Sequence, residues 1–228
     1  VLLNESPLVL SRTVDKGQRI VNGLLDVLKL YLTQVFYLPL LIVGILLAAY
    51  GFPYSSAQGG GVALLTLTIP AIGLSFWATG GALPAVSLGR ELAHFVIPAA
   101  ATMALAGLAV FIVLLGQSGD VDYTQLVLTY ALVSMGLLLV IFIKPPLRFS
   151  PDRLVVKGDL RPTILVLICA LLFLVLTYIP LAQRLFDIAP LQQPSHYLVV
   201  GAIVLVWALS VQLIWLAVPL QPRVRFTG

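Results

Sequence analysis

Residues 124–143 read TQLVLTYALVSMGLLLVIFI, a run without a single Asp, Glu, Lys or Arg. An α-helix needs about 20 apolar residues to cross the roughly 30 Å of hydrocarbon in a bilayer. Similar uncharged runs occur along the rest of the chain, at residues 31–50, 62–79, 95–116, 163–183 and 197–218. The sequence therefore predicts an all-α, polytopic membrane protein with six transmembrane helices.

The overall composition agrees with this class. Hydrophobic residues make up 60% of the 228 residues and charged residues 10%, and the mean hydropathy is +1.07, which excludes an ordinary soluble domain. The net charge of +4 does not indicate nucleic-acid binding, because the basic residues are spread through the segments that flank the apolar runs. We expect the lipid bilayer as a partner and no nucleic acid. The single cysteine, Cys169, lies inside an apolar run, where we expect it to pack.

The basic residues also predict an orientation. With six spans both ends of the chain lie on one side, and twelve of the thirteen Lys and Arg residues then share that side, with Arg184 alone opposite. Loops rich in Lys and Arg stay in the cytoplasm. We therefore expect cytoplasmic N- and C-termini.

Residues 1–30 differ from the rest of the chain. Residues 1–3, Val-Leu-Leu, could end a buried strand, and from about Leu8 apolar and charged residues alternate with a helical period. No proline interrupts this pattern before Pro39, so the helix is predicted to run from water directly into the first span. Such a helix is a rigid mechanical link, and the alternative is a juxtamembrane helix that lies on the lipid surface.

The second span holds the strongest local anomaly, residues 66–75, which read TLTIPAIGLS. Pro70 removes one backbone donor and clashes with the carbonyl of Thr66, and in lipid the freed groups must find other partners. The first interpretation is a broken helix whose carbonyls coordinate a cation. The second is a proline kink satisfied by Thr and Ser, with Gly73 for close packing. Just before this span, Gly59-Gly60-Gly61 is predicted to be a turn.

Three strings near the N-terminus carry a family resemblance. They are VLLNES at residues 1–6, GQRIVNG at residues 17–23 and LKLYLT at residues 28–33. Together they resemble the junction between cytoplasm and membrane in P-type cation-transporting ATPases. In the second span, LTIPA at residues 67–71 is similar to the sixth helix of a bacterial branch of that family. The resemblance is specific over about residues 1–80 and rests on topology beyond them.

The resemblance implies a division of the chain and a location. Residues 1–12 would be the end of a cytoplasmic phosphorylation-domain-like segment, and residues 13–228 would be the transmembrane domain, corresponding to helices five to ten of the family. The chain would lie in the bacterial cytoplasmic (inner) membrane. Its missing partners would be the cytoplasmic and N-terminal membrane domains, and the lack of an initiator Met suggests that the chain begins inside a longer polypeptide.

The resemblance also implies roles for particular residues. The helix that contains Gly17, Arg19 and Asn22 would couple domain motion to the membrane. Acidic ion ligands of the calcium and sodium/potassium pumps are missing here, and no charge lies centrally in any run. The cation would then meet neutral oxygens, and the transported ion is not assigned. The candidate ion path consists of Gln34, Tyr37, Thr66, Thr68, Pro70 and Ser75.

The family's catalytic motifs, D-K-T-G-T, T-G-E and G-D-G-x-N-D, do not occur in this chain. We therefore predict no catalytic, cofactor-binding or assigned metal-binding residue, and we expect ATP and Mg only in a full-length pump. A different class of function stays open, a non-catalytic membrane scaffold or accessory subunit of a larger complex, including a pump remnant. Half of a secondary transporter is disfavoured, because there is no internal repeat and no buried charge.

Overall fold

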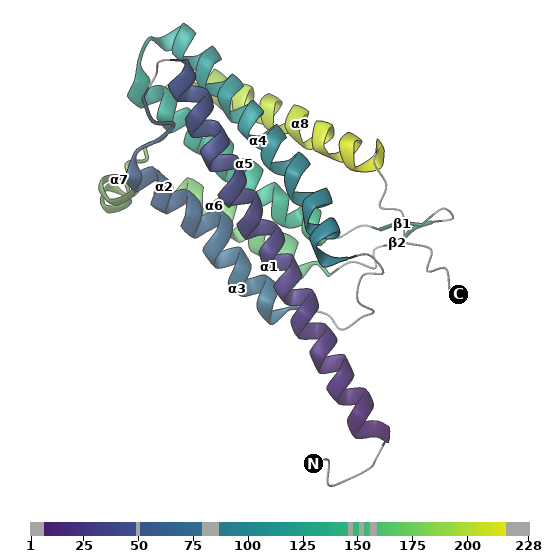
Figure 1. Ribbon diagram of the computed structural model, residues 1–228. Helices are drawn as coiled ribbons and strands as arrows, with labels where there is room; N and C mark the ends of the chain where they lie inside the picture. Colours follow the sequence, from purple (N-terminus) through teal and green to yellow (C-terminus); the bar gives the residue numbers. More distant parts are fainter. Residues whose placement is uncertain are drawn as a thin grey trace.

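The computed structural model describes residues 7–48, 51–78, 87–145, 148–150, 153–155 and 159–217, so the strand expected at residues 1–3 lies outside the described residues. The described part is a bundle of long helices (Figure 1). Five helical segments are long and apolar enough to cross a membrane, and a bent pair of helices makes a sixth if it counts as one span. The prediction of an all-α polytopic membrane protein is confirmed.

The first helix is continuous, as predicted. Helix α1 runs from Pro7 to Leu47 with Pro39 inside it, and its 41 residues are about 60 Å long at 1.5 Å per residue. That is about twice the thickness of the hydrocarbon core. Figure 1 shows the N-terminal part of α1 projecting well beyond the bundle, while the C-terminal part packs along it.

The second span is an unbroken helical path made of three segments. Helix α2 (Ser56–Ala63) passes into a π-helical segment η1 (Leu64–Thr68) and then into α3 (Ile69–Phe76), with helical dihedral angles at both junctions. The N–H of Ile69 donates to the carbonyl of Leu64, five residues back, so one extra residue is accommodated just before Pro70. The prediction of a turn at Gly59-Gly60-Gly61 was wrong, because these glycines lie inside α2.

The fifth span departs from its predicted bounds. Helix α6 (Arg161–Leu176) ends before α7 (Pro180–Phe186), and the two are bent by 101°, so residues 163–183 do not form one straight helix. Ile179 takes an extended conformation, which is what a residue before proline favours. The Gln183 side chain donates to the Thr177 carbonyl at 2.7 Å and so helps to close the end of α6.

The remaining spans are close to their predicted bounds. Helix α4 covers Leu88–Ser118, α5 covers Val121–Ile143 and α8 covers Pro194–Ala217. Between α5 and α6, strand β1 (Arg148–Ser150) pairs antiparallel with strand β2 (Arg153–Val155). Among the spans α5 is the most buried, and it contacts α4, α6 and α8, so it forms the centre of the bundle.

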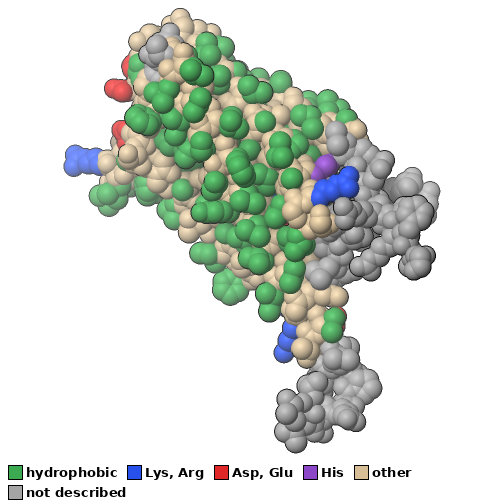
Figure 2. Space-filling view, in the orientation of Figure 1, with side chains coloured by type: hydrophobic (Ala, Val, Ile, Leu, Met, Phe, Trp, Pro, Cys, Tyr) green, Lys and Arg blue, Asp and Glu red, His purple; other side chains and the backbone are tan. Residues whose placement is uncertain are grey.

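Apolar side chains cover much of the surface in Figure 2, as expected for a protein whose solvent is lipid. We call the end where α3 and α5 finish and α4 and α6 begin the basic end. Its described cations include Arg19, Lys29, Arg90, Lys144 and Arg161. We call the opposite end, where α4 finishes and α5 begins, the far end. These two names fix the position of every site below.

Candidate functional site

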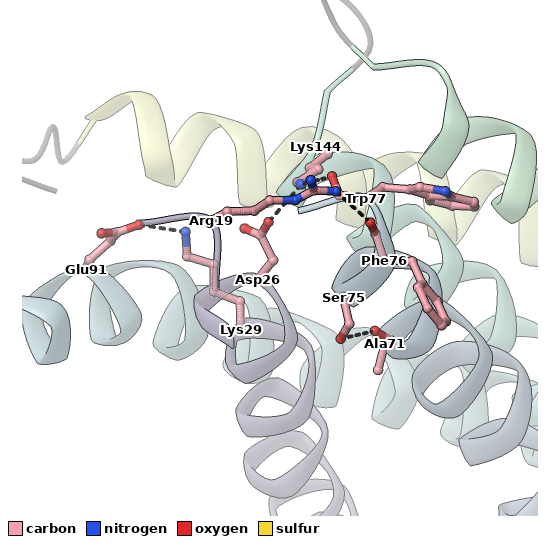
Figure 3. A network of polar contacts seen from close by, with 9 residues as sticks. All are labelled: Arg19, Asp26, Lys29, Ala71, Ser75, Phe76, Trp77, Glu91 and Lys144. Atoms are coloured by element: carbon pink, nitrogen blue, oxygen red, sulfur yellow. Dashed lines mark hydrogen bonds and ion pairs between the residues drawn. The ribbon is translucent and has the colours of Figure 1, made fainter. Parts of the chain in front are cut away.

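The main polar cluster of the described residues lies at the basic end, where α1 passes the ends of three other helices (Figure 3). We call it the basic-end junction. Its members are the side chains of Arg19, Asp26, Lys29, Glu91 and Lys144 with the carbonyl groups of Phe76 and Trp77. These side chains come from α1, from the start of α4 and from the end of α5.

One face of α1 carries the contacts to the second span. Arg19, Gly23 and Asp26 are spaced i, i+4 and i+7, so they follow one another along the same side of the helix. We call these three residues the docking strip. Arg19 Nη2 donates to the Phe76 carbonyl at 3.2 Å, and a Cβ added to Gly23 would lie only 2.7 Å from Ala78 Cβ. The missing side chain at Gly23 therefore allows α1 to approach the end of the second span.

Helix α3 has no basic residue of its own to bind the carbonyl groups at its C-terminal end. The last carbonyls of a helix have no intrahelical donor, and positive charge is favourable there. No basic residue lies in the last turn of α3. Arg19 of α1 donates to Phe76 O, and Lys144 Nζ from the end of α5 donates to Trp77 O at 3.3 Å. The end of the second span is therefore capped by two other helices.

Two ion pairs attach α1 to its neighbours. Lys144 Nζ lies 3.2 Å from Asp26 Oδ2, and Lys29 Nζ lies 2.7 Å from Glu91 Oε1. The four side chains are only 14–17% exposed, so they are largely shielded from water. Removing one partner of a buried pair leaves an uncompensated charge, which is more costly than the pair is stabilising. These pairs fix α1 against α5 and α4.

The structure separates the hydroxyl groups of the predicted ion path. Thr66 is buried and donates to the Val62 carbonyl at 2.7 Å, whereas Thr68 and Ser75 are exposed and donate to the carbonyls of Ala63 and Ala71. All three hydroxyl protons are thus used by the backbone of the same span. Pro70 is buried and Gln34 is half-buried. Because some of these residues face the core and others the surface, they do not converge on one cavity.

The Tyr37 hydroxyl has a different environment. Tyr37 is 2% exposed, and its buried hydroxyl makes no hydrogen bond of good geometry, although it interacts with the nearby side chain of Tyr54. Tyr54, in the segment between α1 and α2, lies near it, and burial raises the pKa of Tyr54 to about 12. Tyr54 therefore keeps its proton at neutral pH. The two tyrosines can therefore offer neutral hydroxyl oxygens to a ligand. Neutral oxygens are the ion ligands expected from the sequence, because no acidic residue lies centrally in the spans.

The far end has a polar cavity that the sequence did not predict. Its volume is about 630 Å³, and its lining includes Gln58, Asp120, Asp122, Arg184 and Asp187. Gln58 is buried at its wall, where Nε2 donates to the Asp187 carbonyl at 2.9 Å and Oε1 accepts from Thr129 at 3.3 Å. Within the described residues, no group of three or more His, Cys, Asp or Glu could hold a metal ion.

The three residues predicted to couple domain motion to the membrane differ in their contacts and burial. Arg19 belongs to the basic-end junction, Asn22 is half-buried on the same helix, and Gly17 has open space around it. The sequence interpretation missed the pairing of Asp26 with Lys144. The two residues lie on the same predicted side of the membrane, Asp26 five residues before the first predicted span and Lys144 one residue after the fourth, but no sequence pattern pairs them. Comparison of the chain with protein-family models and with curated proteins found no match.

Proposed function

We propose that this chain is the membrane part of an ATP-driven cation pump of the P-type class. In this proposal α1 transmits the movement of a cytoplasmic domain to the second span. The observation that carries it is the combination of an unbroken α1 with a docking strip that meets the end of that span. A rigid rod that projects from the bundle and contacts the end of a membrane helix where it enters the bundle is suited to mechanical coupling.

The second span is a suitable receiver of such a movement. Its C-terminal end is held by Arg19 and Lys144, and its middle contains the π-helical segment η1. π-Helical turns are frequent at functional sites, because the extra residue loosens the regular hydrogen-bond ladder. A displacement of the C-terminal end of α3 would therefore change the conformation of η1 first. We place the ion path beside this segment, with Tyr37 and Thr66 as its buried oxygens.

In the proposed orientation the basic end faces the cytoplasm, as the positive-inside rule requires. The projecting part of α1 would then meet the nucleotide-binding and phosphorylation domains of the full-length protein. ATP and Mg would bind in those domains. The bacterial inner membrane is the proposed location, and the transported cation is left open.

The proposal is tested on the native polypeptide that carries this C-terminal segment. Its intact mass is measured, and the purified protein is incubated with radiolabelled ATP in the presence and absence of monovalent and divalent cations. We expect a mass several-fold above that of the 228-residue chain and a cation-dependent, acid-stable phosphoenzyme. A mass close to that of the chain, with no phosphoenzyme, would contradict the proposal.

The second candidate is a non-catalytic membrane scaffold or accessory subunit. It is favoured by the hydroxyl groups of Thr66, Thr68 and Ser75, which are used by their own backbone and so behave as structural polar groups. This function predicts that the native polypeptide co-purifies with a larger partner complex in stoichiometric amounts. It also predicts that substitution of Tyr37 leaves the activity of that complex unchanged.

A further inference from the structure

Lys144 stands at the point where three helices meet. It follows the last residue of α5, and its Nζ contacts the Asp26 carboxylate of α1 at 3.2 Å and the Trp77 carbonyl at the end of the second span at 3.3 Å. Figure 3 shows Lys144 reaching the Asp26 and Trp77 groups from one position. One ammonium group therefore joins α1, the second span and the central helix.

The geometry makes the two contacts of Lys144 dependent on each other. An ammonium group has three donors on a flexible stem, so it can serve a carboxylate and a carbonyl together only while both lie within reach. Asp26 also belongs to the docking strip, three residues after Gly23, which touches Ala78. A movement of α1 along or around its axis displaces Asp26 and Gly23 together, and it changes the position that Lys144 can take.

We propose that Lys144 is a positioning residue that sets the place of the end of the second span relative to α1. With Asp26 beside it, Lys144 is held over Trp77 O and fixes the end of α3 against the central helix. When α1 withdraws Asp26, Lys144 follows the carboxylate or loses it, and the end of α3 is released. The use of this release in transport rests on the proposed function, whereas the positioning itself does not.

The other ion pair of the junction provides a matched comparison. Lys29–Glu91 is as buried as Lys144–Asp26 and also starts from α1, but it ends on α4 and makes no described contact with the second span. If Lys144 acts through position, loss of its charge will disturb the second span more than loss of the Glu91 charge. If the junction is only a stabilising cluster, the two losses will have similar effects.

The test measures a distance between α1 and α3 in the full native polypeptide, in lipid nanodiscs and without nucleotide. Spin labels are placed on cysteines at Ile20 and Ile72, which are 71% and 55% exposed and lie outside the junction contacts. Cys169 is buried, so protein without introduced cysteines serves as the labelling blank. A second label pair at Leu105 of α4 and Leu205 of α8 reports on the rest of the bundle.

Lys144→Met is expected to broaden the distance distribution between positions 20 and 72 and to shift its main peak, while the pair at 105 and 205 stays unchanged. Asp26→Asn, a milder change, is expected to broaden the first distribution as well. Lys144→Arg, Glu91→Gln and the exposed-site control Lys16→Met are expected to keep it narrow. The proposal is overturned if Lys144→Met leaves the distribution narrow, if Glu91→Gln broadens it equally, or if both label pairs change together. These readouts need no ATP, so they stand whether or not a phosphoenzyme forms.

Discussion

Gly23→Ala is the substitution that most directly tests the contact between α1 and the second span. The new Cβ would lie 2.7 Å from Ala78 Cβ, whereas unbonded carbon atoms are comfortable at about 3.5–4.0 Å. Neither carbon belongs to a flexible side chain, so α1 and the residues that directly follow α3 must separate by about 1 Å. We expect the contact that Gly23 allows to be lost rather than absorbed.

The magnitude follows from the neighbouring contacts. Arg19–Phe76 O at 3.2 Å is already at the long end for an N–H···O bond, so a further 1 Å breaks it, whereas Lys144–Trp77 O joins α5 to the end of α3 and is not lengthened directly. Overpacking costs about 1–3 kcal/mol, and the better helix propensity of alanine returns at most about 1 kcal/mol. We expect the free energy of unfolding to fall by about 1–2 kcal/mol, with the exposed Arg19 contact contributing little because water screens it.

Gly17→Ala provides the control on the same helix. A Cβ at Gly17 meets nothing within 4 Å, so this variant gains helix propensity without a clash. Both variants are unfolded with increasing SDS in mixed micelles, and the free energies are compared. In a functioning pump, Gly23→Ala is also expected to slow turnover more than phosphorylation. A Gly23→Ala protein that is as stable as Gly17→Ala would refute the close approach and with it the docking strip.

Three further predictions concern the second span and its surroundings. Gly136→Ala would bring a Cβ within 2.7 Å of Thr66 Cβ and Cγ2, so it should lower the free energy of unfolding by about 1–3 kcal/mol. Thr66→Ser removes the Cγ2 methyl group, so the double variant should regain part of the lost stability. Tyr37→Phe removes a buried hydroxyl that makes no hydrogen bond of good geometry, so the free energy of unfolding should change little. A fall in cation-stimulated activity would then identify the hydroxyl as a ligand, whereas unchanged activity would remove it from the ion path. Burial raises the pKa of Tyr54 from 10.0 to about 12 in the folded protein, so the stability that its neutral hydroxyl contributes below pH 10 should be lost as the pH rises towards about 12. In unfolding curves recorded across this pH range, Tyr54→Phe should reduce that loss.

The membrane class and most spans could be predicted from the sequence, because the length of an apolar run reports directly on bilayer thickness. Helices α4, α5 and α8 extend a few residues beyond their predicted runs, since polar residues continue a helix outside the hydrocarbon. The predicted end of the fifth span, residue 183, lies beyond the end of α6 at Leu176, because the apolar residues continue past the point where the helix stops. Hydropathy alone does not register that Pro180 begins a new helix at an angle of 101°.

The candidate site was only partly predictable. Arg19 was found on α1, yet its acceptor is a backbone carbonyl, which no side-chain pattern reveals. Asp26 precedes the first predicted run by five residues and Lys144 directly follows the fourth, and their pairing depends on how α1 packs beside α5. The choice of Lys144 over Lys29, three residues away on the same helix, needed the packing.

The conformation of the π-helical segment could not be predicted from the local sequence alone. Thr66 and Pro70 stand four residues apart, so a regular α-helix would bring the proline ring against the Thr66 carbonyl, and the backbone had to depart from α geometry. A broken helix and a wider turn both relieve that clash. The close contact between Thr66 and Gly136 of α5 belongs to the wider turn, because it holds the bulged residue against the central helix. The outcome therefore depends on a glycine in a different span, and a change at Gly136 should alter the second span even though its own sequence is untouched.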